Sequence, residues 1–323
     1  MKRGPGLVIA LLLCGLGLPS AASQTYPDKT IKLIVPYTPG SPVDAGGRII
    51  AEDLQKRLGQ SVIMEARSGA GSAIGTKAAA VAPPDGYTLL LTGTPLMYLP
   101  TMYPNSGGEV VKDLVPIAPF LIWSHVIVVL PDIPAKTLPE LVAYAKANPG
   151  KLVWGYGLGS APHILGESLK QAAGIDIASI PYRGGDGARA DLLGGRVHMN
   201  IAPLAAMLPL IREGKVRALA FTGQTRSPDI PDVPTTKEAG YPTVGYDPDV
   251  WLGILGPPGT PAVVVDKINA AFSEGLKTPE VLGAFRRLGF EPMSQTPKEF
   301  AAFIDGELKK WPPLLAAANI KAQ

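Results

Sequence analysis

Residues 31–59 read IKLIV, then PYTPGSP, then VDAGGRIIAEDLQKRLG, and this stretch decides the fold. Its first five residues are almost all apolar, which is typical of a buried strand, and Pro36 ends that strand. Apolar residues return at helical spacing over 45–58, where a helix is predicted, and Gly59 follows as a stop signal. A strand, a short loop and a helix in this order form the repeating unit of α/β folds.

The loop of this stretch carries the signals that start a helix. Ser41 is a candidate N-cap, Pro42 stands at the first helical position, and Asp44 is placed to cap back onto the loop.

The same alternation of strands and helices continues along the chain, which predicts mainly parallel sheets. Further strands are predicted at residues 62–66, 87–92, 152–156, 178–182, 197–201 and 216–222, and further helices at 138–147, 162–173, 186–193, 204–212, 261–276, 279–288 and 297–311. The Gly/Ala-rich segment from Gly69 to Val81 is also expected to become helical after Gly71.

Two segments are predicted to cross between two lobes. Residues 117–130 form a long apolar run closed by prolines, and residues 250–255 form a strand that returns. We therefore expect two α/β lobes joined by a two-segment hinge, with residues 25–124 plus 247–323 in one lobe and 125–246 in the other. In such an architecture the ligand site lies in the cleft between the lobes.

Residues 1–24 have the pattern of a secretory signal peptide. Lys2 and Arg3 precede an apolar run at 7–18, and small residues follow it. The run is too short for a good membrane anchor. Removal of this segment also removes the chain's one cysteine, Cys14, so neither a disulfide nor a cysteine metal site is expected. The mature protein is expected in the periplasm.

Composition narrows the range of partners. Hydrophobic residues make up 46% of the chain and charged residues 18%, which supports a folded core. The formal net charge is +3 and no block of basic residues stands out, so nucleic acid is not an expected partner.

Three loops that join a strand to a helix form the candidate binding site. Glycine lets a ligand approach the backbone closely, and the free N–H groups of a helix start attract a carboxylate. The candidate ligand-binding residues of these loops are Tyr37, Pro39, Gly40, Ser41 and Asp44; Tyr156, Gly157, Leu158, Gly159, Ser160 and His163; and Arg183 and Gly184. The alternative is that these are ordinary turns with capped helices.

Catalytic and metal sites are less well supported. His163 and Glu167 share a helix face as metal ligands can, but no third ligand is evident. Ser160 and His163 are close in sequence, but the G-x-S-x-G motif of a hydrolase nucleophile is absent. We expect neither a catalytic residue nor a cofactor, and no bound metal.

Seven motifs, in order along the chain, resemble those of the Bug-type periplasmic receptors of tripartite tricarboxylate transporters. They are YPDKTI (26–31), VPYTPG (35–40), APPDGYTLL (82–90), IPYRG (180–184), LLGG (192–195), PDVPT (231–235) and PPGTP (257–261). The resemblance implies a type II periplasmic-binding fold that closes on a small carboxylate and delivers it to the transporter's membrane subunits. It adds Thr92, Gly93, Thr94 and Asn200 to the ligand-binding residues, and a monomer is expected.

Several positions depart from the family pattern. Ser41-Pro42, Leu96-Met97-Tyr98 and Leu158 replace smaller or more polar residues, while Arg183 and Asn200 replace Lys and Asp. These departures favour an aromatic or otherwise apolar carboxylate over citrate. A receptor that signals to a membrane sensor, or a hydrolase on the same fold, are the alternatives.

Overall fold

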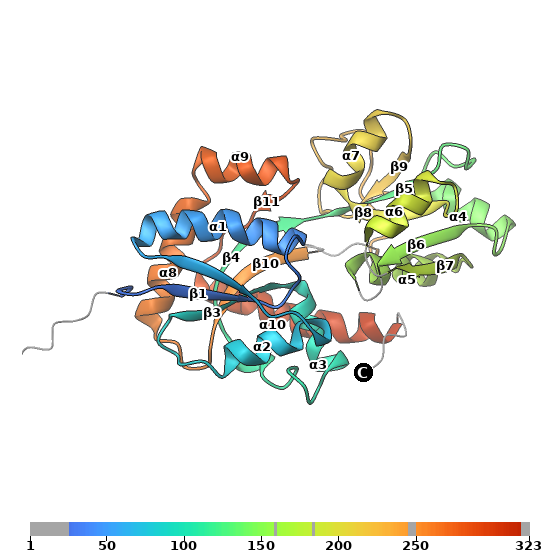
Figure 1. Ribbon diagram of the computed structural model, residues 1–323. Helices are drawn as coiled ribbons and strands as arrows, with labels where there is room; N and C mark the ends of the chain where they lie inside the picture. The colour runs from blue at the N-terminus through green and yellow to red at the C-terminus, as the bar shows by residue number, and fades with distance from the viewer. Residues whose placement is uncertain (1–25, 158–159, 183–184, 245–249, 318–323) are drawn as a thin grey trace, which may run out of the picture.

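The computed structural model describes residues 26–157, 160–182, 185–244 and 250–317, and it contains two β-sheets (Figure 1). The six-stranded sheet has the order β11-β4-β10-β3-β1-β2. Its strands are β1 (Ile31–Val35), β2 (Val62–Ala66), β3 (Thr88–Gly93), β4 (Val115–Trp123), β10 (Val250–Gly256) and β11 (Glu291–Pro292). We call this sheet and its helices lobe 1.

The five-stranded sheet has the order β7-β6-β8-β5-β9 and, with its helices, forms lobe 2. Its strands are β5 (His125–Val129), β6 (Val153–Gly157), β7 (Ala178–Tyr182), β8 (Met199–Pro203) and β9 (Arg217–Phe221). The prediction of two α/β lobes is confirmed.

Both sheets are built on one plan. In lobe 1, β1 pairs in parallel with β2 and β3, and in lobe 2, β6 pairs in parallel with β7 and β8. Next to these parallel strands lies a strand that runs antiparallel to both of its neighbours, β10 in lobe 1 and β5 in lobe 2. Each of these two strands follows a crossing from the other lobe, so the crossings are integral parts of the sheets.

The first crossing is very short. β4 ends at Trp123 in the six-stranded sheet and β5 begins at His125 in the other, so Ser124 alone separates them. The apolar run predicted to cross between lobes is thus two buried strands in different sheets. The return crossing leads into β10, and residues 245–249 before it lie outside the described residues.

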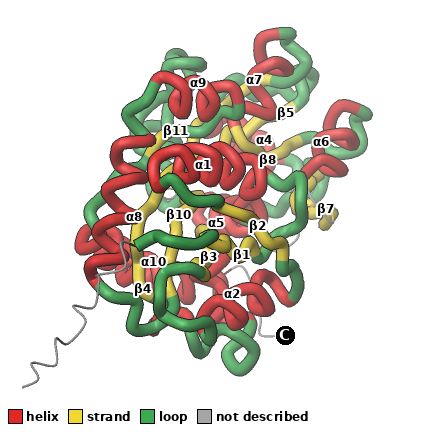
Figure 2. Tube along the Cα trace, turned by 60° about the vertical axis from the view of Figure 1, so that its left-hand side comes forward, coloured by secondary structure: helices red, strands yellow, loops and turns green. Residues whose placement is uncertain are grey.

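Helices cover both faces of each sheet, as Figure 2 shows from a second direction. In lobe 1 they are α1 (Pro42–Leu58), α8 (Ala262–Gly275) and α9 (Pro279–Arg287) on one face, with α2 (Ala73–Ala80), α3 (Leu99–Met102) and α10 (Pro297–Ala317) on the side of the other. In lobe 2, α4 (Leu138–Ala147) and α5 (Ala161–Ala173) cover one face, and α6 (Gly185–Leu193) and α7 (Leu204–Arg212) cover the other. Among the described helices, none combines the length and apolarity needed to cross a membrane.

Alternating side chains explain these two layers. Along β1, Leu33 belongs to the apolar cluster beneath α1 and α8, while Ile34 belongs to the cluster beneath α2 and α10. Successive side chains of a strand point to opposite faces, so a fully apolar strand requires cover on both sides.

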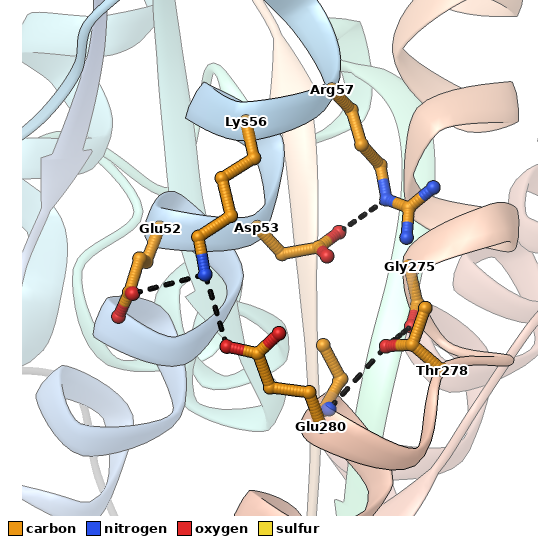
Figure 3. Close-up of polar contacts among 8 residues, drawn as sticks. Glu52, Asp53, Lys56, Arg57, Gly275, Thr278 and Glu280 are labelled. Atoms are coloured by element: carbon orange, nitrogen blue, oxygen red, sulfur yellow. Dashed lines mark hydrogen bonds and ion pairs between the residues drawn. The ribbon is translucent and has the colours of Figure 1, made fainter.

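A polar contact joins α1 to α9 on the surface of lobe 1 (Figure 3). Lys56 of α1 contacts Glu280 of α9 at 2.9 Å, and Asp53 pairs with Arg57 beside Gly275 at the end of α8. A Cβ added at Gly275 would lie 2.0 Å from an oxygen of the Asp53 carboxylate, so that side chain would have to move to admit it.

Some element boundaries differ from the prediction. α1 begins at Pro42 rather than at residue 45, because the Ser41 cap starts the helix immediately. β8 spans 199–203 rather than 197–201. α10 was predicted to end at Trp311 but continues to Ala317 through two prolines, since Trp311 and Leu315 are both buried on one face of it. A 3₁₀ turn at Thr94–Tyr98, together with α3 and β11, was not predicted.

Candidate functional site

A cavity of about 600 Å³ lies between the two lobes. The carboxyl ends of the parallel strands of both sheets meet there, which is where open α/β sheets bind ligands. Lobe 1 contributes Gly40, Ser41, Val43, Thr94, Tyr98, Trp123, Leu288 and Phe290, among others, and lobe 2 contributes His125, Tyr156, Gly157, Ser160, Ala161, Arg189, Asn200 and Met207, among others.

The start of α1 forms one wall of the cavity. The Ser41 side chain accepts a hydrogen bond from the N–H of Asp44 at 3.2 Å, so Ser41 is the N-cap as predicted. The Asp44 carboxylate accepts from the N–H of Gly40 at 3.0 Å and also pairs with Arg48. The loop is therefore held in shape by its own side chains.

The charge state of Asp44 follows from these contacts. Burial by itself would raise the pKa of Asp44. The hydrogen bond from Gly40 and the hydrogen bonds and positive charge of Arg48 outweigh burial and hold the pKa of Asp44 below its ordinary value of 3.8. Asp44 is therefore ionised at neutral pH and counteracts part of the positive end of the helix dipole.

The start of α5 faces the same cavity from lobe 2. Ser160, Ala161 and Pro162 all line it. The Ser160 hydroxyl does not cap the helix but donates to the carbonyl of Gly157 at 2.7 Å. Leu158 and Gly159, which were predicted to contact ligand, lie outside the described residues.

Stacked aromatic rings pack beside the start of α5. The Tyr156 ring lies 4.2 Å from the His163 ring at 10° and 4.6 Å from the Trp154 ring. Burial lowers the pKa of His163 below its ordinary value of 6.5, so its imidazole is mainly neutral at neutral pH. Burial raises the pKa of Tyr156, and the nearby charge of Glu167 adds to this effect. His163 therefore supports Tyr156 as part of an aromatic stack.

The last residues of β3, and Thr94 just after it, make contacts within lobe 1. The hydroxyls of Tyr37 and Thr92 lie 3.0 Å apart, and burial raises the pKa of Tyr37 to about 12. The Thr94 hydroxyl accepts from the N–H of Trp251 at 3.0 Å, which ties the cavity lining to β10. Gly93 has no room for a side chain, since an added Cβ would lie 2.1 Å from the Trp251 carbonyl.

The polar side chains that lobe 2 presents to the cavity are mostly paired. The Asn200 side chain donates to the carbonyl of Gly155 at 3.1 Å, and Asn200 is buried. Arg189 pairs with Asp186 at 2.9 Å on the same helix, α6. Among the described residues that line the cavity, Asp186 contributes the one carboxylate and Arg189 contributes the one guanidinium. Their formal charges cancel.

The predicted site residues fall into three groups. Gly40, Ser41, Thr94, Tyr156, Gly157, Ser160 and Asn200 line the cavity. Tyr37, Asp44, Thr92, Gly93 and His163 stand behind that lining and contact or support it, and Pro39 is exposed next to Gly40. Leu158, Gly159, Arg183 and Gly184 lie outside the described residues.

Several lining residues were not predicted. Trp123 and His125 flank the first crossing, and Leu288 and Phe290 come from the segment after α9. His125 is buried and also lines the cavity. Of the three residues predicted to make the pocket apolar at 96–98, only Tyr98 lines it, whereas Leu96 and Met97 are fully buried. The position of Trp123 at the predicted crossing was the one signal in the sequence that this residue lines the cleft.

The described residues include no group of three His, Cys, Asp or Glu side chains arranged to hold a metal ion.

Comparison with known proteins identifies the family. A family model described as "Tripartite tricarboxylate transporter family receptor" matches residues 47–320. The protein BugT of Bordetella pertussis is 36% identical over 318 residues, which cover 97% of each chain. The resemblance read from the motifs is thereby confirmed.

Solved structures agree with this assignment. The periplasmic binding protein BugD is 33% identical, with a TM-score of 0.76 over 92% of this chain and 100% of BugD. A protein of R. palustris solved with adipate is 29% identical, with a TM-score of 0.78 over 92% of this chain and 100% of that one. The predicted periplasmic-binding fold is confirmed, and the chain belongs to the tripartite tricarboxylate transporter receptor family of solute-binding proteins.

Proposed function

We propose that this protein captures a small carboxylate with an aromatic or otherwise apolar body in the periplasm, after removal of residues 1–24. Closure of the lobe formed by residues 25–124 and 247–323 against the lobe formed by 125–246 encloses the ligand. The loaded receptor then delivers it to the membrane subunits of a tripartite tricarboxylate transporter. The observation that carries this proposal is that the starts of α1 and α5, one from each lobe, line the same cavity.

The hydrogen bonds of the α1 start indicate which group meets the carboxylate there. The N–H groups of Gly40, Ser41, Asp44 and Ala45 all have partners within the loop and first turn. Pro42 has no N–H, so Val43 supplies the remaining donor of this described turn. A ligand carboxylate between Val43 and the first turn of α5 would lie at the positive ends of two helix dipoles.

The rest of the lining supports an apolar ligand body. Trp123, Leu252 and Phe290 in lobe 1 and Ile201 and Met207 in lobe 2 present hydrocarbon surface to the cavity. A more polar acid such as citrate, which has three carboxylates and a hydroxyl, would lose water there without gaining hydrogen bonds, which costs free energy.

Thermal unfolding of the purified mature protein with benzoate, hexanoate, adipate and citrate tests the proposal. A ligand that binds the native state raises the midpoint of unfolding. We expect benzoate or hexanoate to raise it and the matched amides, benzamide and hexanamide, to leave it unchanged. An amide that stabilises the protein as well as its acid would count against a carboxylate site. If no acid shifts the midpoint, a mass spectrum of the denatured protein that shows no bound acid would also count against a carboxylate site.

Two glycines provide a matched pair of variants. Gly40 and Gly59 both have positive φ, +81° and +68°, and both have open space where a side chain would go. Valine is strained at either position, so both variants should lose similar stability. Only Gly40 lines the cavity, so Gly40→Val should abolish the ligand-induced shift and Gly59→Val should retain it. Equal ligand responses from the two variants would remove the α1 loop from the binding site.

A further inference from the structure

The segment that follows α9 presents apolar side chains to the cavity on a backbone that is hydrogen-bonded to the end of α9. Leu288 and Phe290 line the cavity, and Leu288 is 40% exposed although it is large and apolar. The N–H groups of Leu288 and Phe290 both donate to the carbonyl of Phe285, at 2.9 and 3.0 Å. The Phe290 ring also lies 5.4 Å from the ring of Trp123. We call residues 288–290 the α9 tail.

The first turn of α7, in lobe 2, lies directly against the α9 tail. A Cβ added at Gly289 would stand 2.0 Å from the Cβ of Ala205 and 3.1 Å from its Cα. Gly289 also has φ +69°, so only glycine fits there without strain. The two lobes thus touch through a glycine backbone and an alanine methyl group, and Ala206 and Met207 line the cavity beside this contact.

The described residues that line this end of the cavity carry no charged side chain. Ala205, Ala206, Met207, Leu288 and Phe290 all line the cavity, and Ala205 lies against Gly289 where the two lobes touch. Asp186 and Arg189, the charged lining residues that the structure describes, come from α6 and pair with each other at 2.9 Å. A second carboxylate placed against the α9 tail would lose its hydration without a cationic partner.

We propose that the α9 tail and the first turn of α7 form a selectivity wall that receives the hydrocarbon end of a monocarboxylate. The inference rests on the proposed function and deepens it by naming the residues that set ligand length. Ala206 leaves the space that a longer chain occupies, and Leu288 supplies the apolar surface that the chain covers. Each additional methylene that this wall buries strengthens binding.

The test is isothermal titration of butanoate, hexanoate, octanoate and adipate into the wild-type protein and its variants. We expect wild-type affinity to rise from butanoate to hexanoate, and hexanoate to bind about tenfold more tightly than adipate, which has the same length and a second charge. Affinities that do not depend on chain length would contradict the proposed selectivity wall. Tighter binding of adipate than of hexanoate would contradict it as well. If no acid binds, the proposed function fails, and this inference with it.

Two variants examine the wall itself. Ala206→Leu should weaken octanoate and hexanoate binding by about tenfold or more while leaving butanoate unchanged, because the added side chain fills the far space. Leu288→Asn should weaken the same two ligands by a similar factor. Because Leu288 is partly exposed, that variant is expected to fold even if Ala206→Leu does not.

Matched control variants distinguish an effect on the selectivity wall from a general effect of the same substitution elsewhere in the protein. Leu193 is 47% exposed at the end of α6 and does not line the cavity, so Leu193→Asn should leave all affinities unchanged. Ala302 is exposed on α10, so Ala302→Leu serves in the same way for Ala206→Leu. If the two wall variants bind every acid as their controls do, residues 206 and 288 do not set selectivity.

Discussion

At the scale of single residues, Asp44 shows how the binding loop is held before ligand arrives. Its carboxylate fixes the N–H of Gly40 and pairs with Arg48 one helical turn later. Asp44 is buried, but Arg48 is largely exposed, so the hydrogen bond to Gly40 matters more than the ion pair. This arrangement also places a negative charge at the helix end that is proposed to attract a carboxylate, and that charge weakens the attraction.

Replacing this side chain should lower stability in a pH-dependent way. Asp44→Ala should reduce the free energy of unfolding by about 1 kcal/mol at neutral pH, because the carboxylate's bonds to the N–H of Gly40 and to Arg48, which support the capped helix start, are lost. The folded state lowers the pKa of Asp44, so its stabilisation is present above the ordinary value of 3.8 and is lost as the pH falls through the lower folded value.

Urea unfolding of wild type and Asp44→Ala, at neutral pH and well below pH 3.8, measures this difference. The difference in free energy of unfolding between the two proteins should become smaller in acid. A difference that stays constant across this pH range would show that the ionised carboxylate does not support the loop.

At the scale of elements, α5 depends on a glycine in order to pack on its sheet. Trp154 of β6 is fully buried, and its ring lies under Gly166 in the middle of α5. A Cβ added at Gly166 would lie 2.0 Å from two carbons of that ring. The helix therefore approaches β6 more closely than an alanine would allow, and this approach sets where the first turn of α5 meets the cavity.

Two substitutions of glycine by alanine should have opposite effects. Gly166→Ala should destabilise the protein by about 1–3 kcal/mol, because the buried ring cannot move away. Gly306 lies in α10 with open space around it, so Gly306→Ala should stabilise the protein by about 0.5–1 kcal/mol through helix propensity alone. Chemical denaturation of both variants measures the difference. Stabilisation by Gly166→Ala would contradict the close packing of α5 on Trp154.

At the scale of the whole molecule, the two lobes share one apolar core. A single cluster of buried residues includes Ile34 and Leu90 of lobe 1 and Trp154 and Leu165 of lobe 2. α10 contacts α5, and its Leu315 belongs to the same cluster. Figure 1 shows α10 running from beneath the six-stranded sheet toward lobe 2. The lobes are therefore coupled by α10 as well as by the crossings.

A shared core predicts that both lobes unfold together. Thermal unfolding should give one transition with the same midpoint by tryptophan fluorescence and far-UV circular dichroism. Leu315→Ala should lower that common midpoint, since loss of a fully buried leucine costs about 2–5 kcal/mol. Val263→Ala, at a position that is 73% exposed, should have little effect. Two separate transitions, or a loss confined to one probe in Leu315→Ala, would contradict a common core.

Local signals in the sequence were sufficient for most elements. The N-cap at Ser41 with Pro42 and the αL glycine at Gly59 mark the two ends of α1, and both act through bonds within a few residues. Prolines misled the prediction at α10, because Pro312 and Pro313 break helices in general and burial of Leu315 overrode that tendency here.

The sequence by itself determined the alternating α/β pattern, the crossing near Ser124 and the glycine-rich loops that line the cavity, since each depends on neighbouring residues. The tertiary structure alone decided which distant segments meet. The α9 tail reaches the cavity because β11 pairs with β4, and Gly289 meets Ala205 across the two lobes. Such contacts depend on packing between residues far apart in the chain, for which a local pattern carries no signal.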